Sequence, residues 1–160
     1  MNEKGQGEAV FRLLIDSVVG MAILLIIISM ISYFNNQVIE QSRVDLINSM
    51  NDAVSSPDGK IVKTGDLTFA KGFVVNQAFA QDWTGQGAKC FSFDARGASL
   101  NILTKDGVPA GVQFTQNLTI QVNIQCKSSS NANSCNPKIA PETEADCCFT
   151  CLIAFGKDIK

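Results

Sequence analysis

An unbroken run of uncharged residues, 17–39, constrains this chain of 160 residues more than any other feature. Within it, the stretch 18–34 departs from large or apolar side chains only at Gly20, Ser29 and Ser32. As a helix that rises about 1.5 Å per residue, the uncharged run is roughly 34 Å long, which is enough to cross the hydrocarbon core of a bilayer. The sequence therefore predicts a segment that is surrounded by lipid or by other protein.

A secretory signal peptide is the alternative interpretation of this run. The apolar region of a signal peptide is usually about 7–15 residues long and ends at small residues where the peptide is cleaved. Here the apolar run continues through the bulky Tyr33 and Phe34. The length of the run and its bulky end favour a membrane span.

Apolar residues continue at helical spacing beyond the uncharged run. With polar residues between them, they recur at Ile39, Leu46, Ile47, Met50 and Val54. This periodicity is typical of an amphipathic helix. We therefore expect one helix from about Glu8 to Ala53, apolar all round in its first half and amphipathic in its second. The segment Ser55-Ser-Pro-Asp-Gly59 marks its end, because proline cannot continue the hydrogen-bond ladder and Pro-Asp-Gly favours a tight turn.

Beyond this turn the sequence changes to short β-like segments separated by glycine-bearing turns. The clearest strand is Leu118–Cys126, in which apolar and polar residues alternate, so that each set lies on its own face. The face suited to a core carries Leu118, Ile120, Val122, Ile124 and Cys126. Weaker strand candidates are 61–63, 67–70, 73–75, 89–93, 99–104, 112–114 and 148–155. The predicted fold is α+β: a long N-terminal hydrophobic helix followed by a head, 57–160, built as an antiparallel β-sheet or small β-sandwich.

All six cysteines lie in the head and none lies in the helix. They are Cys90, Cys126, Cys135, Cys147, Cys148 and Cys151. An even number of cysteines beyond a membrane span is typical of disulfides on an oxidising side, each worth about 2–4 kcal/mol. We favour a Cys126–Cys135 bridge, which closes a polar loop between the two residues. Adjacent Cys147 and Cys148 point to opposite faces if they lie in a strand, so we expect them to bond to different partners.

A zinc site is the alternative for Cys148-Phe-Thr-Cys151, since two further thiolates would complete a tetrahedral ligand set. The sequence has no second Cys-x-x-Cys, and the membrane span argues for export. A thioredoxin-like redox pair is disfavoured because no βαβ pattern surrounds these residues. We therefore expect structural disulfides, with no metal and no cofactor.

The composition also weighs against catalysis and against nucleic acid. The chain has no histidine, which excludes a Ser-His-Asp triad and a His-based zinc site. Its formal net charge is −2, and no run of lysine or arginine supplies a local basic surface. We expect neither an enzyme nor a nucleic-acid-binding protein.

The first residues, Met1-Asn-Glu-Lys-Gly-Gln-Gly-Glu-Ala-Val-Phe-Arg-Leu-Leu14, carry the most specific functional signal. A short polar leader ends in Lys4-Gly5, Gln6-Gly7 follows, and the long apolar helix comes next. This arrangement resembles the class III signal of archaeal type IV pilin-like proteins, in which a peptidase cuts after the glycine. The resemblance covers the N-terminal helix and not the head. It implies cleavage between Gly5 and Gln6, a leader 1–5 and a membrane or filament-core helix 6–56.

The resemblance further implies a structural subunit of an extracellular type IV pilus-like filament, which is a helical homo-oligomer at the cell surface. A signal peptidase and an assembly machinery would be its partners, and the precursor would cross the membrane once with its N-terminus inside. The helices would form the filament core, and the head would serve adhesion or surface contact. The core-forming residues that we expect are Ile23, Leu24, Ile27 and Ile31. The alternative is a single-pass membrane-anchored surface binding protein that does not polymerise.

A charge ladder precedes the apolar run. Lys4, Glu8, Arg12 and Asp16 alternate in sign at spacings of four residues, so they share one helix face. The family typically has a glutamate four positions after the first mature residue, where this chain has Val10. At a membrane interface Arg12 would extend toward the headgroups, whereas in a filament the four charges would need partners because an unpaired buried charge is costly.

One Asn-x-Ser/Thr sequon occurs in the chain, at Asn117-Leu-Thr119. Strand alternation places Asn117 and Thr119 opposite the apolar face that begins at Leu118. Asn117 should therefore project outward, where an exported head accepts an N-linked glycan without disturbed packing. The alternative is an unmodified polar residue on the strand.

We predict that Gly5→Val blocks maturation, because the proposed cleavage follows this glycine. The variant should leave a longer chain that stays in the membrane. Intact mass spectrometry and the yield of surface filaments test this outcome. A variant whose mature mass and filament yield equal those of the wild type would show that the cleavage site is wrong.

Overall fold

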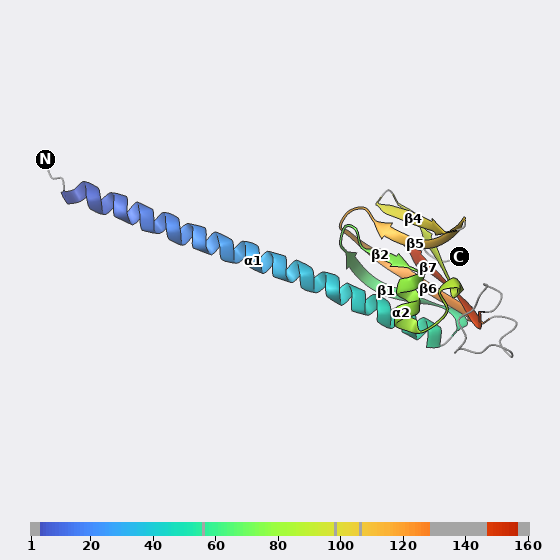
Figure 1. Ribbon diagram of the computed structural model, residues 1–160. Helices are drawn as coiled ribbons and strands as arrows, with labels where there is room; N and C mark the ends of the chain where they lie inside the picture. Colours follow the sequence, from blue (N-terminus) through green and yellow to red (C-terminus); the bar gives the residue numbers. More distant parts are fainter. Residues whose placement is uncertain (1–3, 56, 98, 106, 129–146, 157–160) are drawn as a thin grey trace. The chain divides into compact units, whose positions relative to one another are not determined.

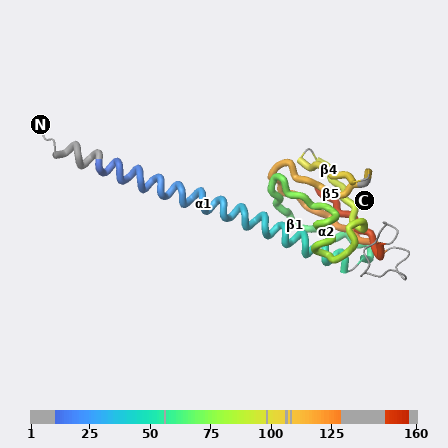
Figure 2. The backbone as a smooth tube through the Cα atoms, viewed as in Figure 1, coloured from blue at the N-terminus to red at the C-terminus, as the bar shows by residue number. Residues whose placement is uncertain are grey.

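The computed structural model describes residues 4–55, 57–97, 99–105, 107–128 and 147–156; for 4–10 and 108 it describes the backbone alone. The chain divides into two units, 1–38 and 39–160, which we treat separately. Helix α1, Lys4–Ser55, belongs to both units (Figures 1 and 2). The expected long helix is confirmed, and it extends slightly beyond both expected ends.

The end of α1 follows the local chemistry of its sequence. The Ser55 hydroxyl donates to the carbonyl of Asn51 over 2.7 Å, and Pro57 then prevents the helix from continuing. The Asp58 carboxylate accepts a hydrogen bond from the Lys60 amide at 2.9 Å, while Gly59 has a φ of 81° that other residues rarely adopt. The predicted end of the helix before Pro57 is thus confirmed.

The head contains seven strands, one short α-helix and one 3₁₀ turn in its described residues (Figure 1). In chain order they are β1 (Asp58–Phe69), β2 (Val74–Asn76), α2 (Gln77–Thr84), η1 (Ala88–Cys90), β3 (Phe91–Ala95), β4 (Leu100–Lys105), β5 (Val108–Phe114), β6 (Leu118–Ser128) and β7 (Phe149–Phe155). One sheet has the strand order β1-β6-β7-β3, and the other has the order β2-β5-β4. Every strand candidate from the sequence coincides with or overlaps one of these strands.

The α+β prediction is therefore confirmed, with one departure in the larger sheet. β1, β6 and β7 pair in antiparallel fashion, but β3 pairs with β7 in parallel, with Phe91 opposite Cys151 and Ala95 opposite Phe155. The last strand in the sequence thus lies in the interior of the sheet, between β6 and β3. Parallel pairing requires a crossover through other elements, and here those elements include the β4–β5 hairpin and β6.

Helix α2 was not predicted. Its N-terminus is capped by the Asn76 side chain, which accepts from the Phe79 amide at 2.8 Å, and its C-terminus ends at Gly85 with a left-handed φ of 69°. Asparagine and glycine are the usual residues at these two positions. The caps were present in the sequence, but eight residues are too few for a clear helical period.

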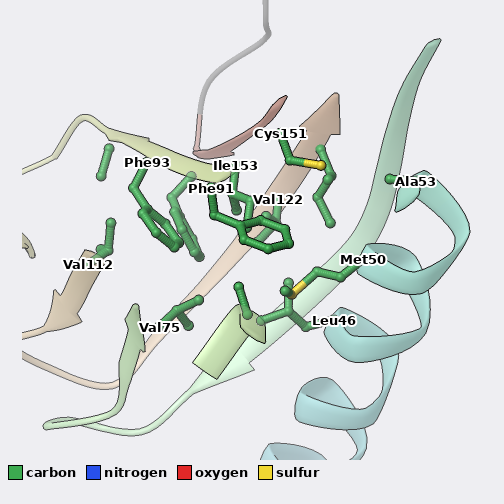
Figure 3. Close-up of a cluster of buried hydrophobic side chains, with 14 of the residues drawn as sticks. Leu46, Met50, Ala53, Val75, Phe91, Phe93, Val112, Val122, Cys151 and Ile153 are labelled. Atoms are coloured by element: carbon green, nitrogen blue, oxygen red, sulfur yellow. The ribbon is translucent and has the colours of Figure 1, made fainter. Parts of the chain in front are cut away.

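Both sheets and the second half of α1 share one hydrophobic core. Phe69 of β1 stacks on Phe114 of β5 with ring centroids 4.4 Å apart, which joins the two sheets. Leu46 and Met50 extend from α1 into the cluster that contains Phe91 (Figure 3), and both are fully buried. The amphipathic part of α1 beyond residue 39 therefore contributes to the core of the head, which the sequence analysis did not predict.

The core face of β6 is confirmed where the strand crosses the core, whereas Asn123 of the expected polar face is also buried there. Val122, Ile124 and Cys126 are at most 1% exposed, and Leu118 and Ile120 pack against the same cluster as half-buried residues. Burial of the core-facing positions of one strand contributes about 1.5–3 kcal/mol for each large side chain. Burial of its core-facing side chains thus stabilises β6 in the sheet.

Two disulfides hold β7 to the elements on its two sides. Cys126 of β6 bonds to Cys151 directly opposite it on β7, and Cys90 of η1 bonds to Cys147 just before β7. The favoured Cys126–Cys135 bridge is therefore wrong, because the register of β6 and β7 brings Cys151 to Cys126 across the sheet. Cys135 itself lies outside the described residues.

The adjacent cysteines behave as expected in one respect. Cys147 bonds to Cys90 and not to its neighbour Cys148, which is itself in a disulfide. Cys151 is bonded to Cys126, so Cys148 and Cys151 do not form a redox pair with each other. In disulfide form neither sulfur is a thiolate ligand, and the zinc alternative is disfavoured for this reason.

We expect the double variant Cys126→Ala/Cys151→Ala to lower the free energy of unfolding of the head by about 3–4 kcal/mol, because the unfolded chain regains the freedom of the closed loop. The two residues are separated by 25 positions. A urea titration of the full chain in detergent micelles, read by pulse proteolysis, measures the change. Thr150→Ala, at an exposed position of the same strand, is the control and should change the value by less than about 0.5 kcal/mol. Equal stability of the double variant and the wild type would contradict the expectation.

Candidate functional site

The main candidate site is the apolar surface of α1 in the first unit. From Phe11 to Val38, every large apolar side chain is between 46% and 74% exposed. The four expected core-forming residues belong to this surface: Ile23, Leu24, Ile27 and Ile31 are between 50% and 58% exposed. By length and composition this helix is able to cross a membrane. Monomeric soluble proteins rarely expose an apolar surface of this extent, so it is suited to lipid or to other helices.

Two polar side chains on this stretch bond to neighbours within the helix. The Ser29 hydroxyl donates to the carbonyl of Leu25 over 2.8 Å, and the Gln37 side-chain amide donates to the Tyr33 hydroxyl over 2.7 Å. Backbone hydrogen bonds of an α-helix are likewise internal. The surface offered to a neighbour is thus mainly apolar over 18–34, and it becomes polar at Asn35 and Asn36. A shallow depression on it is lined by Leu25, Ile26, Ser29, Met30, Tyr33 and Phe34.

The N-terminal signal residues lie in the first turns of α1. Lys4, Gly5, Gln6 and Glu8 are helical in backbone, and their side chains are outside the described ones. Arg12 and Asp16, the other half of the charge ladder, are exposed. The ladder therefore has the helical backbone that its four-residue spacing requires.

The sequon residues project from the head as expected. Asn117 and Thr119 are exposed, whereas Leu118 between them is half-buried. The side-chain Oδ1 of Asn117 accepts a hydrogen bond from the Lys71 backbone amide at 2.8 Å, and the Thr119 hydroxyl lies 2.9 Å from that of Thr68. The side chain that would carry a glycan is accessible and oriented by the backbone of the head.

The head also carries a cation–aromatic contact, between Arg43 and Trp83, that the sequence analysis did not predict. The guanidinium carbon of Arg43, on α1, lies 5.5 Å from the ring centroid of Trp83 on α2. Trp83 in turn lies 6.5 Å from Phe79, whose ring leads to the core through Phe73 at 5.9 Å. The contact joins elements that are far apart in the sequence, so no local pattern predicts it. The one sequence feature that pointed to this place is the single tryptophan between Asn76 and Gly85.

A groove on the head is lined by charged and apolar residues together, which are Asp52, Asp58, Lys60, Ile61 and Val62. The Asp58 carboxylate there accepts from the Lys60 amide in its own turn. Among the described residues, no group of three His, Cys, Asp or Glu side chains is placed to hold a metal ion. The candidate functional features of the described residues are therefore surfaces: the exposed apolar side chains of α1 and the surface of the disulfide-linked head.

Comparison of the chain with protein-family models, with curated proteins and with solved structures finds no match.

Proposed function

We propose that this chain is a structural subunit of an extracellular type IV pilus-like filament, with α1 in the filament core and the head on the surface. The observation that carries the proposal is the exposure of every large apolar side chain from Phe11 to Val38. Such a surface is stable only when lipid or other apolar helices cover it. A bundle of identical helices provides that cover along the whole stretch.

The same helix serves two stages. Before assembly it anchors the subunit in the membrane, and in the filament it exchanges lipid contacts for contacts with neighbouring helices. Because lipid tails are as apolar as leucine, this exchange is driven by close packing. Gly20 supports such packing because it has no side chain to keep a neighbouring helix at a distance. Within this chain, no atom of the described residues lies within 4 Å of the position that a Cβ would take there, so the space is open to a neighbour.

The N-terminal sequence adds to the proposal. Lys4-Gly5-Gln6-Gly7 stands directly before the apolar helix, as in the archaeal type IV pilin-like proteins that it resembles. On that resemblance a peptidase removes residues 1–5, and an assembly machinery extracts the mature subunit from the membrane. The disulfides of the head agree with its location on an oxidising, extracellular side. Adhesion or surface contact is the role that we propose for the head.

A single-pass surface protein that never polymerises is the second candidate. It is favoured by the length of the uncharged run, 17–39, which matches one bilayer without need of a filament. Electron microscopy of purified surface material, together with the intact mass of the subunit, separates the two. Filaments with a subunit mass that lacks residues 1–5 support the proposal. Protein found only in alkali-resistant membranes, in unprocessed form, supports the second candidate.

We predict that Leu24→Ala weakens the filament more than the head. Truncation of a leucine inside packed helices typically costs about 2–5 kcal/mol, and Leu24 is 58% exposed in its own unit of the chain. The dissociation temperature of purified filaments should fall, while the protease resistance of the oxidised head should stay unchanged. Ile102→Ala, which truncates an exposed apolar residue of β4, is the matched control and should leave filaments intact. Filaments of Leu24→Ala that dissociate exactly as the wild type do would place Leu24 outside the core.

We also expect an N-linked glycan at Asn117, because its side chain is exposed and the head is exported in this proposal. In a filament a glycan would add polar bulk between neighbouring heads. Peptide mass spectrometry of the native protein should show the added mass in the wild type and in Thr119→Ser, which keeps the sequon. Thr119→Ala should abolish it. An unmodified Asn117 in all three proteins would remove the glycan from the proposal.

A further inference from the structure

Trp83 is the single tryptophan of the chain, and it is 45% exposed on the head. Its ring lies against Arg43, with the guanidinium carbon 5.5 Å from the ring centroid. A cation over an indole face is favourable by about 0.5–1 kcal/mol at an exposed site. The pair therefore presents an amphipathic ring and a positive charge side by side on the surface of the head.

Arg43 has hydrogen-bonding capacity that the head does not use. Its carboxylate partner, Glu40, lies 3.9 Å away, which is at the outer limit of an ion pair. Its Nε is buried and meets no acceptor within the described part of the chain. The terminal nitrogens of a guanidinium carry donors in a planar fork that matches phosphate oxygens, and because the Arg43 side chain is 39% exposed, these nitrogens and not the buried Nε are suited to an external phosphate.

The position of the pair along α1 indicates where such phosphates are found. Ile39 is the last residue of the uncharged run and the first residue of the head unit. Arg43 follows one helical turn later, about 6 Å further along the axis. The headgroup layer on each side of a bilayer is roughly 5–8 Å thick. When 17–39 fills the hydrocarbon core, Arg43 lies within this layer, and its contact with the indole brings Trp83 there as well.

We propose that Arg43 and Trp83 form an interfacial anchor that docks the head onto the phospholipid headgroup layer of the membrane. The indole takes the interfacial position that tryptophan prefers, and the guanidinium binds lipid phosphate. The inference rests on the membrane-anchored stage of the proposed function. It adds that the head contacts the headgroup layer through these two side chains before assembly.

Phosphate within zwitterionic lipid is the ligand that the local charges favour. Glu40 and Asp45 flank Arg43 on α1, and Asp82 precedes Trp83 on α2. These carboxylates oppose attraction to a strongly anionic surface, since they outnumber the guanidinium among the flanking charges. A phosphatidylcholine surface offers the phosphate without a net negative charge.

The single tryptophan makes the proposal directly measurable. The full chain is reconstituted into phosphatidylcholine vesicles that contain lipids brominated either near the glycerol end or near the methyl end of the acyl chain. We expect quenching of Trp83 fluorescence by the shallow bromines to exceed that by the deep bromines by about twofold or more, as for an interfacial indole. Both orientations of the chain in the vesicle place Trp83 at an interface, so mixed insertion does not affect the result.

Arg43→Gln should reduce the shallow quenching by about half, because the indole loses the cation that holds it toward the phosphates. Arg96→Gln, which removes an exposed arginine elsewhere on the head, is the matched control and should leave the quenching unchanged. Extraction of the same vesicles with alkali reports insertion independently. Inserted protein whose Trp83 is quenched by neither lipid would overturn the anchor alone, including the case in which another protein copy covers the ring. Protein that alkali extracts would overturn the membrane stage and, with it, the anchor.

Discussion

One helix has to satisfy two environments, and the rest of the structure depends on this constraint. In its second half, α1 is amphipathic and places Leu46 and Met50 in the core of the head. In its first half the stretch 18–34 is apolar on nearly every side, and every large apolar side chain from residue 11 to 38 is exposed. A helix that is hydrophobic all round is stable only when lipid or protein covers it. Cover from outside the chain is therefore a physical requirement of this sequence.

The head is subject to a different constraint, because its small core is completed by β7, which follows the other described strands in the sequence. β7 lies between β6 and β3, so the larger sheet is incomplete until the chain returns to its interior. The disulfides Cys126–Cys151 and Cys90–Cys147 link β7 to the elements on both sides. A small domain that buries limited apolar area gains a substantial part of its stability from such links. This dependence on oxidation fits a head that folds outside the cytoplasm.

The change from apolar to polar residues along α1 relates the proposed filament core to the proposed membrane anchor. The apolar stretch supplies the contacts for lipid and, in the proposed filament, for neighbouring helices. Arg43 and Trp83 stand just beyond its end, where the chain passes from an apolar to a polar environment. In the proposed sequence of events the head rests on the membrane through this pair, and assembly then replaces both lipid contacts together.

The sequence by itself determined the features that rest on local periodicity and composition: the long helix, its end before Pro57, the core face of β6 and the apolar surface that is the main candidate site. These follow from neighbouring residues, so no knowledge of distant contacts was needed. Only the tertiary structure decided the parallel pairing of β3 with β7, the partner of Cys126 and the contact of Arg43 with Trp83. Each of these joins elements far apart in the chain. Such pairings are set by the sheet register and by the packing of the common core, and local sequence patterns determine neither of these.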